Sequence, residues 1–329
     1  MSILVTGGAG YIGSHMVWRL VDEGESVQIL DNLSTGFDWA IPGSVPLHKG
    51  DVGDEAFLDA LFSREKIDAV IHFAGSVIVP ESVSDPLKYY SNNTGNSRNL
   101  IAACVRHRVE KFIFSSTAAV YGDPEVVPVE ESAALKPLSP YGTSKLMTEQ
   151  MLADTAAAHN FRYVALRYFN VAGAEPSGRT GQSTANATHL IKVACEAALG
   201  KRNSLSVYGS DYDTPDGTGV RDYIHVWDLA LAHQQALRAL NSGADSAIYN
   251  CGYGSGFSVR QVIESVKRIS GVEFTVKEEP RRAGDSPKVI ANPEKIRNAL
   301  DWQPAHDELD EIVSHALAWE NKLSQRNLA

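Results

Sequence analysis

The glycine-rich stretch near the N-terminus is the feature that most constrains the fold of this 329-residue chain. An apolar run over residues 3–5 (ILV) is followed by GGAGYIG at 7–13 and by a helix pattern over 14–21. Strand, glycine turn and helix in this order are typical of a dinucleotide-binding βαβ unit, whose helix N-terminus faces a pyrophosphate. The expected roles are a sharp turn, approach of the pyrophosphate, and close packing of the helix for Gly7, Gly10 and Gly13, respectively.

A second strand, predicted over 26–30, ends in Asp31. That is about the distance downstream at which an acid binds the adenine ribose hydroxyls. A carboxylate there repels a 2′-phosphate, and no arginine follows nearby, so we expect NAD and not NADP as the cofactor. The alternative for the glycines is a tight turn in an unrelated α/β protein, which the position of Asp31 disfavours.

The charge balance and the cysteines limit the classes of protein to which this chain can belong. With 40 acidic and 30 basic residues and a net charge of -10, the chain is a poor candidate for binding nucleic acid or an anionic membrane. Cys104, Cys195 and Cys251 are odd in number and far apart, which predicts neither a disulfide framework nor a metal site. We expect a cytoplasmic protein without a signal peptide, since a core strand begins within three residues of the start and no apolar run is long enough to span a membrane.

Strand and helix patterns alternate through residue 170 and then loosen. This predicts an α/β fold, a Rossmann-type doubly wound parallel sheet with a smaller C-terminal α/β lobe. We expect an NAD-binding domain over 1–170 and a substrate-binding lobe over 171–329, with segments near 225–250 returning to the first domain.

A tyrosine and a lysine four residues apart, Tyr141 and Lys145, share one face of a predicted helix. A tyrosine that acts as a base near neutral pH must lower its pKa of near 10 by about three units, roughly 4 kcal/mol. Lys145 offers a positive charge, and the hydroxyl of Thr117 can bridge the phenolate to a substrate hydroxyl. Alone, such a pair is common on surface helices. Together with the glycine motif, it predicts removal of a hydroxyl proton while a hydride leaves the same carbon.

Two polar residues in the first domain each allow two interpretations. Asp51 follows the short run 45–48, where it contacts adenine or caps the next helix. His72 lies within an apolar strand, where a core histidine is more common than a catalyst.

Seven segments carry a resemblance that runs almost the length of the chain: GGAGYIG (7–13), DNL (31–33), HFAG (72–75), FSSTAAVYG (114–122), PYGTSK (140–145), LRYFN (166–170) and DGTGVRDYIHV (216–226). Together they resemble the UDP-glucose 4-epimerase family of extended short-chain dehydrogenases/reductases. The first and fifth segments are general to that superfamily. The segment containing Arg221, and RRAGD at 281–285, are more specific to nucleotide-sugar enzymes.

The resemblance implies an epimerase that interconverts UDP-galactose and UDP-glucose by transient oxidation at C4 with tightly bound NAD. It gives Tyr141 as base and acid, Lys145 as its electrostatic partner and ribose ligand, and Thr117 as the bridging hydroxyl. Residues that would line NAD, glycine motif included, are Gly7, Gly10, Tyr11, Ile12, Gly13, Asp31, Asn32, Asp51, Val52, Phe73, Ala74, Gly75, Asn92, Lys145 and Phe169. Residues that would bind the UDP-sugar are Thr117, Tyr141, Asn170, His189, Leu190, Ser206, Tyr208, Arg221, Arg282, Asp285 and Val289. It also implies a homodimer built from helices at 86–108 and 141–158.

The chain departs from the family pattern at a few positions. Val77 stands where a lysine near the nicotinamide is frequent, His189 replaces a frequent asparagine, and Lys192 a usual proline. Val289 lies where a bulky aromatic residue excludes N-acetylated sugars, so we expect some activity on UDP-N-acetylgalactosamine. Alternatively, Val289 is only a strand residue and a neighbour fills the space.

Two other functions compete with epimerisation. Nucleotide-sugar 4,6-dehydratases carry Asp-Glu directly after the bridging threonine, whereas this chain has Ala118 and Ala119. A non-catalytic NAD-binding regulator also fits the fold, although the intact Tyr141 and Lys145 argue against it.

Overall fold

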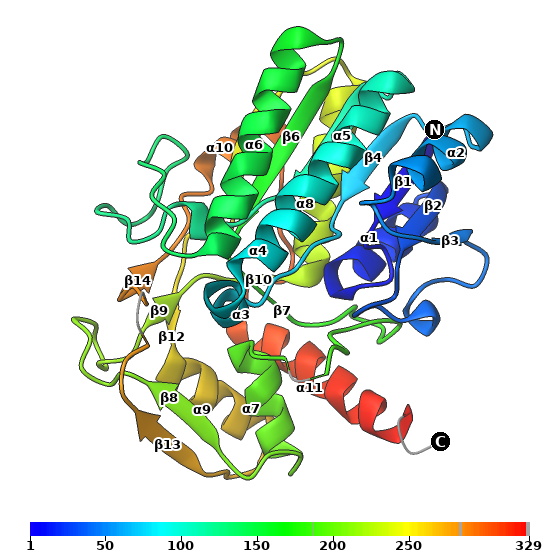
Figure 1. The fold of residues 1–329 in the computed structure, drawn as a ribbon. Helices are drawn as coiled ribbons and strands as arrows, with labels where there is room; N and C mark the ends of the chain where they lie inside the picture. Colours follow the sequence, from blue (N-terminus) through cyan, green and yellow to red (C-terminus); the bar gives the residue numbers. More distant parts are fainter. Residues whose placement is uncertain (186, 283–284, 327–329) are drawn as a thin grey trace.

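A seven-stranded parallel sheet forms the centre of the computed structural model, which describes residues 1–185, 187–282 and 285–326 (Figure 1). The strand order is β3-β2-β1-β4-β5-β6-β11, and every neighbouring pair is parallel. The chain leaves β1 toward β2 and β3, then returns to place β4 on the other side of β1. This reversal creates the crevice at which doubly wound folds bind ligands. The predicted fold class is confirmed. The strands are β1 (Ser2–Thr6), β2 (Ser26–Asp31), β3 (Leu47–Lys49), β4 (Ala69–His72), β5 (Lys111–Ser115), β6 (Arg162–Tyr168) and β11 (Ala247–Cys251).

Helices cover both faces of this sheet, which explains why its strands are apolar at consecutive positions. In β1, Ile3 and Val5 pack on one side with α1 (Tyr11–Asp22) and α8 (Val226–Asn241). Leu4 points to the other side, where the core is shared with α2 (Glu55–Arg64), α5 (Asn96–Arg106) and α6 (Pro140–Ala158). Successive side chains of a strand alternate between faces, so one strand serves both layers.

The helix expected over 86–108 is divided into three parts, and a short helix precedes it. The order is α3 (Val79–Ser84), α4 (Pro86–Tyr89), a π-helical turn η2 (Tyr90–Gly95) and α5. The turn directs Asn93 inward, where its side chain bonds the backbone N–H and C=O of Ser76 and the hydroxyl of Ser144. A π-turn of this kind is frequent at functional sites.

Most of the remaining elements form a lobe below the sheet in Figure 1. Helices α7 (Leu190–Ala198), α9 (Val259–Ser270) and α11 (Leu309–Arg326) pack together there. Its described strands have two to four residues each, too few to show a clear sequence period. They are β8 (Leu205–Tyr208) with β13 (Val276–Glu279), β12 (Phe257–Ser258) with β9 (Val220–Arg221) and β14 (Lys288–Val289), and β7 (Asn170–Ala172) with β10 (Tyr223–His225). The short helices η1 (Asp38–Ala40), η3 (Ala118–Val120) and α10 (Glu294–Leu300) complete the fold.

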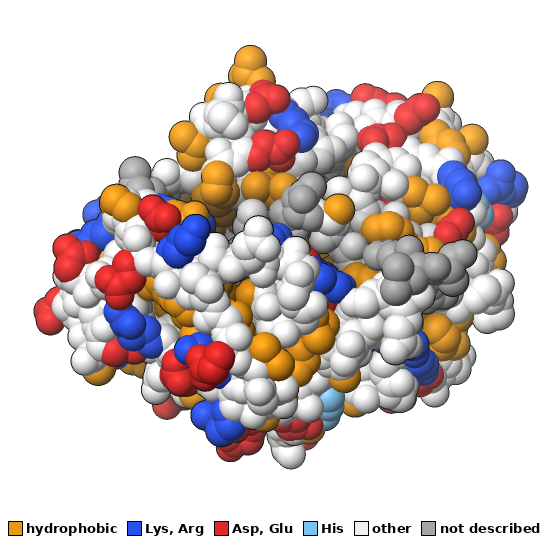
Figure 2. Space-filling view, turned by 90° about the horizontal axis from the view of Figure 1, so that it is seen from below, with side chains coloured by type: hydrophobic (Ala, Val, Ile, Leu, Met, Phe, Trp, Pro, Cys, Tyr) orange, Lys and Arg blue, Asp and Glu red, His pale blue; other side chains and the backbone are white. Residues whose placement is uncertain are grey.

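Segments after residue 225 return to the large sheet. Helix α8 packs against α1, β5 and β6, and β11 pairs with β6 at the edge. We propose that the chain divides into two domains near residue 170, and that the segments near 225–250 belong to the first domain. None of the described helices combines the length and apolarity needed to cross a membrane. Acidic and basic side chains are interspersed on the face shown in Figure 2.

Asp222, between β9 and β10, connects three segments that are distant in sequence. Its carboxylate accepts the backbone N–H groups of Tyr253, Gly254 and Ala291 at 2.9, 3.0 and 3.2 Å. Burial raises the pKa of Asp222 to about 6, while these three bonds act in the opposite direction. The loops after β11 and β14 are thus held to the strand pair β9 and β10.

Replacing Gly13 tests the close contact between α1 and the glycine turn. A Cβ atom at Gly13 would lie 2.1 Å from the carbonyl oxygen of Gly7. We expect Gly13→Ala to lower the free energy of unfolding by about 2 kcal/mol or more, as overpacking does. Gly43→Ala is the matched control, since a Cβ there meets nothing within 4 Å, and we expect a change within about 0.5 kcal/mol. Urea denaturation measures both, and equal stability of the two variants would contradict the prediction.

Candidate active site at the carboxyl ends of the strands

The glycine turn packs directly against the end of β4. Gly7 has a left-handed φ of +69°, and a Cβ there would lie 2.6 Å from the backbone nitrogen of Ala74. The N–H of Gly10 donates to the carbonyl of Gly7 at 3.1 Å, and α1 begins one residue later. The turn therefore presents a helix N-terminus at the crevice, which is the arrangement that binds a pyrophosphate.

Asp31 is fixed at the end of β2 by two backbone groups. Its buried carboxylate accepts the N–H of Ala9, within the glycine turn, at 2.9 Å and the N–H of Leu33 at 2.8 Å. Each oxygen retains a second lone pair for a ribose hydroxyl. The acid and the glycine turn, which the sequence predicts as one site, do lie together.

A chain of polar side chains continues from Asp31 along the strand ends. The amide of Asn32 donates to Asp51 at 2.8 Å, and Asp51 also accepts the side-chain amide of Asn96 at 3.2 Å. Asn96 contacts Asn92, which donates to the hydroxyl of Ser76 at 2.8 Å. Asn96 and Ser76 were not among the predicted site residues.

The surroundings of Asp51 and His72 bear on the two interpretations that the sequence allows for each residue. Asp54, and not Asp51, caps α2 by accepting the N–H of Phe57 at 2.9 Å. His72 is a core histidine, with its ring nitrogens 2.6 Å from the Thr6 hydroxyl and 2.8 Å from the Ser97 hydroxyl. Burial, together with the charge of Lys145, lowers its pKa to about 3, so it is neutral.

Tyr141 lies in the first turn of α6, which starts with Pro140 and is capped by Ser139. The phenol is buried, and the side chain of Thr117 lies near enough to affect its pKa. Burial raises the pKa of Tyr141, and the side chain of Thr117 opposes that shift only in part. The lowered pKa expected from the Tyr-Lys spacing is therefore not a property of the protein groups alone.

Lys145 is buried one turn after Tyr141. Its ammonium donates to the carbonyl oxygen of Ser115 at 2.9 Å and lies 4.9 Å from the centre of the Phe114 ring. Burial lowers its pKa to about 8, which places a titratable cation in the crevice. Beside it, Gly75 is so close that an added Cβ would lie 3.7 Å from the ammonium nitrogen.

A buried ion pair fixes α6 on the sheet. Glu149 of α6 and Arg167 of β6 form two short contacts, at 2.6 Å between Nη2 and Oε2 and 2.9 Å between Nε and Oε1. The hydroxyl of Ser116 donates to Glu149 at 2.5 Å, and Arg167 contacts the hydroxyl of Tyr121 at 3.0 Å. Ser116 directly precedes Thr117, so this network joins the helix of Tyr141 to the segment of Thr117. No sequence pattern predicted this network.

Predicted UDP-binding residues occupy the small sheets of the lower lobe. Arg221 on β9 is the neighbour of Val289 on β14. The guanidinium of Arg282 lies 3.6 Å from the centre of the Tyr208 ring, and Ser206 shares a strand with that tyrosine. Asp285 donates its backbone N–H to the carbonyl of Arg282 at 3.3 Å. Residues 283 and 284 of the RRAGD segment lie outside the described residues.

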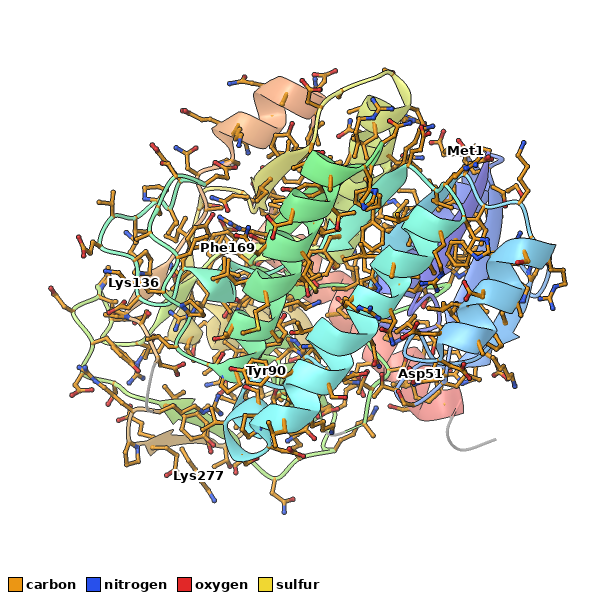
Figure 3. All side chains as sticks on the ribbon, turned by 45° about the horizontal axis from the view of Figure 1, so that its top comes forward. Met1, Asp51, Tyr90, Lys136, Phe169 and Lys277 are labelled. Carbon is orange, nitrogen blue, oxygen red and sulfur yellow. The ribbon has the colours of Figure 1, made fainter. Side chains whose placement is uncertain are left out.

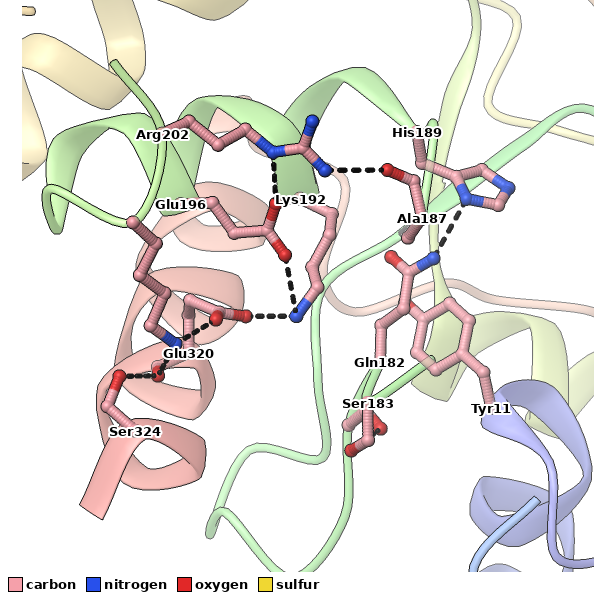
Figure 4. A network of polar contacts seen from close by, with 12 residues as sticks. Tyr11, Gln182, Ser183, Ala187, His189, Lys192, Glu196, Arg202, Glu320 and Ser324 are labelled. Carbon is pink, nitrogen blue, oxygen red and sulfur yellow. Dashed lines mark hydrogen bonds and ion pairs between the residues drawn. The ribbon is translucent and has the colours of Figure 1, made fainter. Parts of the chain in front are cut away.

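Three further predicted residues, Asn170, His189 and Leu190, line one cavity. Lys192 lines it too, but its ammonium forms ion pairs with Glu320 and, at 3.5 Å, with Glu196 (Figure 4). The lysine that replaces the usual proline is thus neutralised by carboxylates within the lobe.

A small apolar cluster connects the two groups of predicted residues. Phe169 is buried with Ala118, Val120 and Tyr121, and Val289 packs against this cluster. Ala118 directly follows Thr117, so Val289 lies near the segment after β5 that contains Thr117. Asp51 and Phe169, both predicted to line the cofactor, lie on opposite sides of α5 and α6 in Figure 3.

Comparisons with known proteins point to one family. Residues 3–252 match the model of the NAD dependent epimerase/dehydratase family. A UDP-glucose 4-epimerase of Azospirillum brasilense is 56% identical over 98% of this chain and 93% of its own length. The crystal structure of the Bifidobacterium longum UDP-glucose 4-epimerase with NAD+ and UDP has a TM-score of 0.93, 38% identity and 98% coverage of both chains. The UDP-Glc/GlcNAc 4-epimerase of Campylobacter jejuni has a TM-score of 0.86 and 49% identity, covering 98% of this chain and 99% of its own.

Breaking the buried ion pair should destabilise the protein strongly. Arg167→Met leaves the Glu149 carboxylate buried without its partner, and we expect a loss of about 3–5 kcal/mol in the free energy of unfolding. Glu149→Leu combined with Arg167→Met removes both charges and should recover at least half of that loss. Urea denaturation measures both variants, and a double variant no more stable than the single one would show that the charge imbalance is not the cause.

Proposed function

Because the chain belongs to the NAD dependent epimerase/dehydratase family, we propose that it interconverts UDP-galactose and UDP-glucose by transient oxidation at C4 with bound NAD. The observation that carries this proposal is the placement of the buried Tyr141 phenol next to the Thr117 side chain, with the buried Lys145 one helical turn after Tyr141. A hydroxyl pair at that place suits removal and return of a sugar hydroxyl proton.

The crevice residues fit an NAD molecule. The glycine turn offers a helix N-terminus for the pyrophosphate, and Asp31 offers carboxylate oxygens for the ribose hydroxyls while repelling a 2′-phosphate. A chain of hydrogen bonds connects Asn32, Asp51 and Asn92, and these three residues would line the adenine and ribose parts of NAD. When bound, NAD supplies the hydride acceptor and a positive charge beside the phenol.

Tyr141 would exchange its proton with the 4-hydroxyl of the sugar through Thr117. The raised pKa of Tyr141 keeps the phenol protonated in the protein alone, so its ionisation depends on added positive charge. Lys145 would contribute by binding the ribose and by holding an ammonium in the same buried crevice. The same phenol would then return the proton to the 4-oxygen once the sugar has turned to its second orientation.

The UDP part would be anchored in the lower lobe. Arg221 and Arg282 would neutralise the diphosphate, which an acidic protein must meet with a few placed cations. Asn170, His189, Leu190, Ser206, Tyr208 and Asp285 would also bind UDP. Holding the nucleotide and not the hexose lets the keto sugar turn between two orientations in one cleft.

Two alternatives are weaker. Elimination of water needs an acid and a base beside Thr117, and the first helical turn after it, η3, carries Ala118 and Ala119 instead. A regulator without catalysis would not require Tyr141 next to Thr117 or the buried Lys145.

We also propose a cytoplasmic homodimer. The three buried free cysteines suit a reducing compartment. The proposed interface uses residues 86–108 and 141–158, where Leu87 and Met147 are exposed apolar side chains. Light scattering at micromolar concentration tests the dimer.

The activity itself is tested with purified protein, UDP-galactose and no added cofactor. We expect UDP-glucose of unchanged mass, because bound NAD is regenerated in each cycle. Mass spectrometry and chromatography of the nucleotide sugars measure it. A product lighter by one water would indicate a dehydratase, and unchanged UDP-galactose a non-catalytic protein.

Removing the hydroxyl of Tyr141 tests the proton relay. Tyr141→Phe should retain NAD and fold normally, yet lose activity by about 100-fold or more, as expected for general acid–base catalysis. Tyr163→Phe, in buried strand β6, is the matched control and should stay within about twofold of wild type. Steady-state kinetics and the absorbance of bound NAD give both readouts. Activity of Tyr141→Phe near that of the control would remove Tyr141 from this role.

Val289 is proposed to set the breadth of sugars that are accepted. Its half-buried side chain packs against the cluster containing Phe169 and Ala118, and valine leaves more space than an aromatic ring. A relative of known structure is described as a UDP-Glc/GlcNAc 4-epimerase. We therefore propose a second activity on UDP-N-acetylgalactosamine.

Val289→Tyr should close that space. We expect kcat/KM for UDP-N-acetylgalactosamine to fall at least about tenfold relative to that for UDP-galactose, while Val289→Ala keeps the wild-type ratio. The measurement is the ratio of the two kcat/KM values in the three proteins. If wild type does not convert the acetamido sugar, or tyrosine leaves the ratio unchanged, Val289 is not the gate.

A further inference from the structure

Gln182 lies in the loop between β7 and α7, with a buried side chain that points to His189 (Figure 4). Its amide nitrogen is 2.8 Å from Nδ1 of the histidine. An amide nitrogen can only donate, so Nδ1 accepts and the neutral ring carries its proton on Nε2. The contact thus determines both the tautomer and the orientation of the ring.

His189 is exposed and immediately precedes α7, where it lines the same cavity as Asn170 and Leu190. Although part of the residue reaches the surface, protein atoms packed around the ring desolvate it and lower its pKa, so the ring is neutral at pH 7. In Figure 4 the other ring nitrogen, Nε2, points away from Gln182 and from the ion pairs around Lys192. His189 stands at the N-cap of α7, and an N–H near a helix N-terminus is well placed for an anion.

The backbone on both sides of His189 is anchored without Gln182. Arg202 donates to the carbonyl of Ala187 at 3.3 Å and pairs with Glu196 of α7 at 2.5 Å. Glu320 of α11 pairs with Lys192, also on α7. Loss of the Gln182 amide should therefore release the imidazole ring while the loop and α7 keep their places.

We propose that Gln182 is a positioning residue that holds His189 as a neutral Nε2–H donor to the diphosphate of UDP. This inference rests on the proposed function, which assigns His189 to the UDP site. A donor without charge keeps its hydrogen bond over a wide pH range, whereas an imidazolium would lose its charge as the pH rises.

Gln182→Ala tests the positioning by the split between KM and kcat. We expect KM for UDP-galactose to rise about fivefold, the loss of one well-oriented hydrogen bond, with kcat within about twofold. His189→Asn provides the control background, because an amide donor needs no tautomer. Adding Gln182→Ala to His189→Asn should change KM less than about twofold. Equal effects in the two backgrounds would show that Gln182 acts on the loop and not on the ring.

Gln182→Glu gives a pH profile that a structural role would not produce. A carboxylate at position 182 accepts a hydrogen bond from Nδ1–H of His189 and raises the pKa of the ring. Above that pKa the neutral ring keeps its proton on Nδ1, so Nε2 presents a lone pair to the phosphate. KM should therefore rise between pH 6 and 9 in Gln182→Glu, while it stays flat in wild type and in Gln182→Glu combined with His189→Asn. A flat profile in all three would overturn the proposal, as would a wild-type KM in Gln182→Ala.

Calorimetric titration with UDP separates this inference from the proposed activity. We expect the dissociation constants for UDP to change among the variants as the KM values do, because calorimetry measures binding and not turnover. If wild type binds UDP with this pattern but converts no sugar, the epimerase proposal fails and the role of Gln182 stands. If it converts the sugar and the variants bind UDP as wild type does, the role of Gln182 is refuted.

Discussion

The buried pair of Glu149 and Arg167 is the interaction on which the geometry of the site depends. Two charges inside a protein are costly unless each is fully hydrogen-bonded, and here Ser116 and Tyr121 complete the set. The pair connects α6 to β6, and Ser116 ties it to the strand end that carries Thr117. The distance between Tyr141 and Thr117 is therefore set by side chains inside the sheet and not by the loops around the crevice. A site built this way is rigid on one side while its other wall belongs to a separate lobe.

The first half of the fold follows from local sequence. The glycine turn, the apolar strands and Asp31 each occupy their predicted places, because a doubly buried parallel strand and a βα turn leave patterns within a few residues. The two- and three-residue strands of the lower lobe could not be predicted, because they are too short to show a period. The hydrogen bonds between Asp222 and the backbone of Tyr253, Gly254 and Ala291 also left no sequence pattern, because these partners are distant from Asp222 along the chain.

Some features of the candidate site could likewise be predicted from the sequence, and others could not. The identities of Tyr141, Lys145 and Thr117 came from spacing and resemblance, and the structure brings Tyr141 and Thr117 close together. The direction of the Tyr141 pKa did not follow from the spacing, because burial of the phenol outweighs the effect of Thr117. Gln182 was not predicted at all, since a glutamine in a loop has no distinguishing sequence context. Burial and the choice of hydrogen-bond partner are properties of the assembled chain.

The return of β11 to the edge of the large sheet has a consequence for synthesis on the ribosome. Strand β6 ends at Tyr168, but its outer neighbour β11 comprises Ala247–Cys251, about 80 residues later. At synthesis rates of about 5–20 residues per second, the edge of β6 waits for several seconds with unpaired backbone groups. During that time α8 is also missing, so one face of the sheet lacks part of its cover. The nascent chain is thus exposed to aggregation after its glycine turn is made and before β11 completes the sheet.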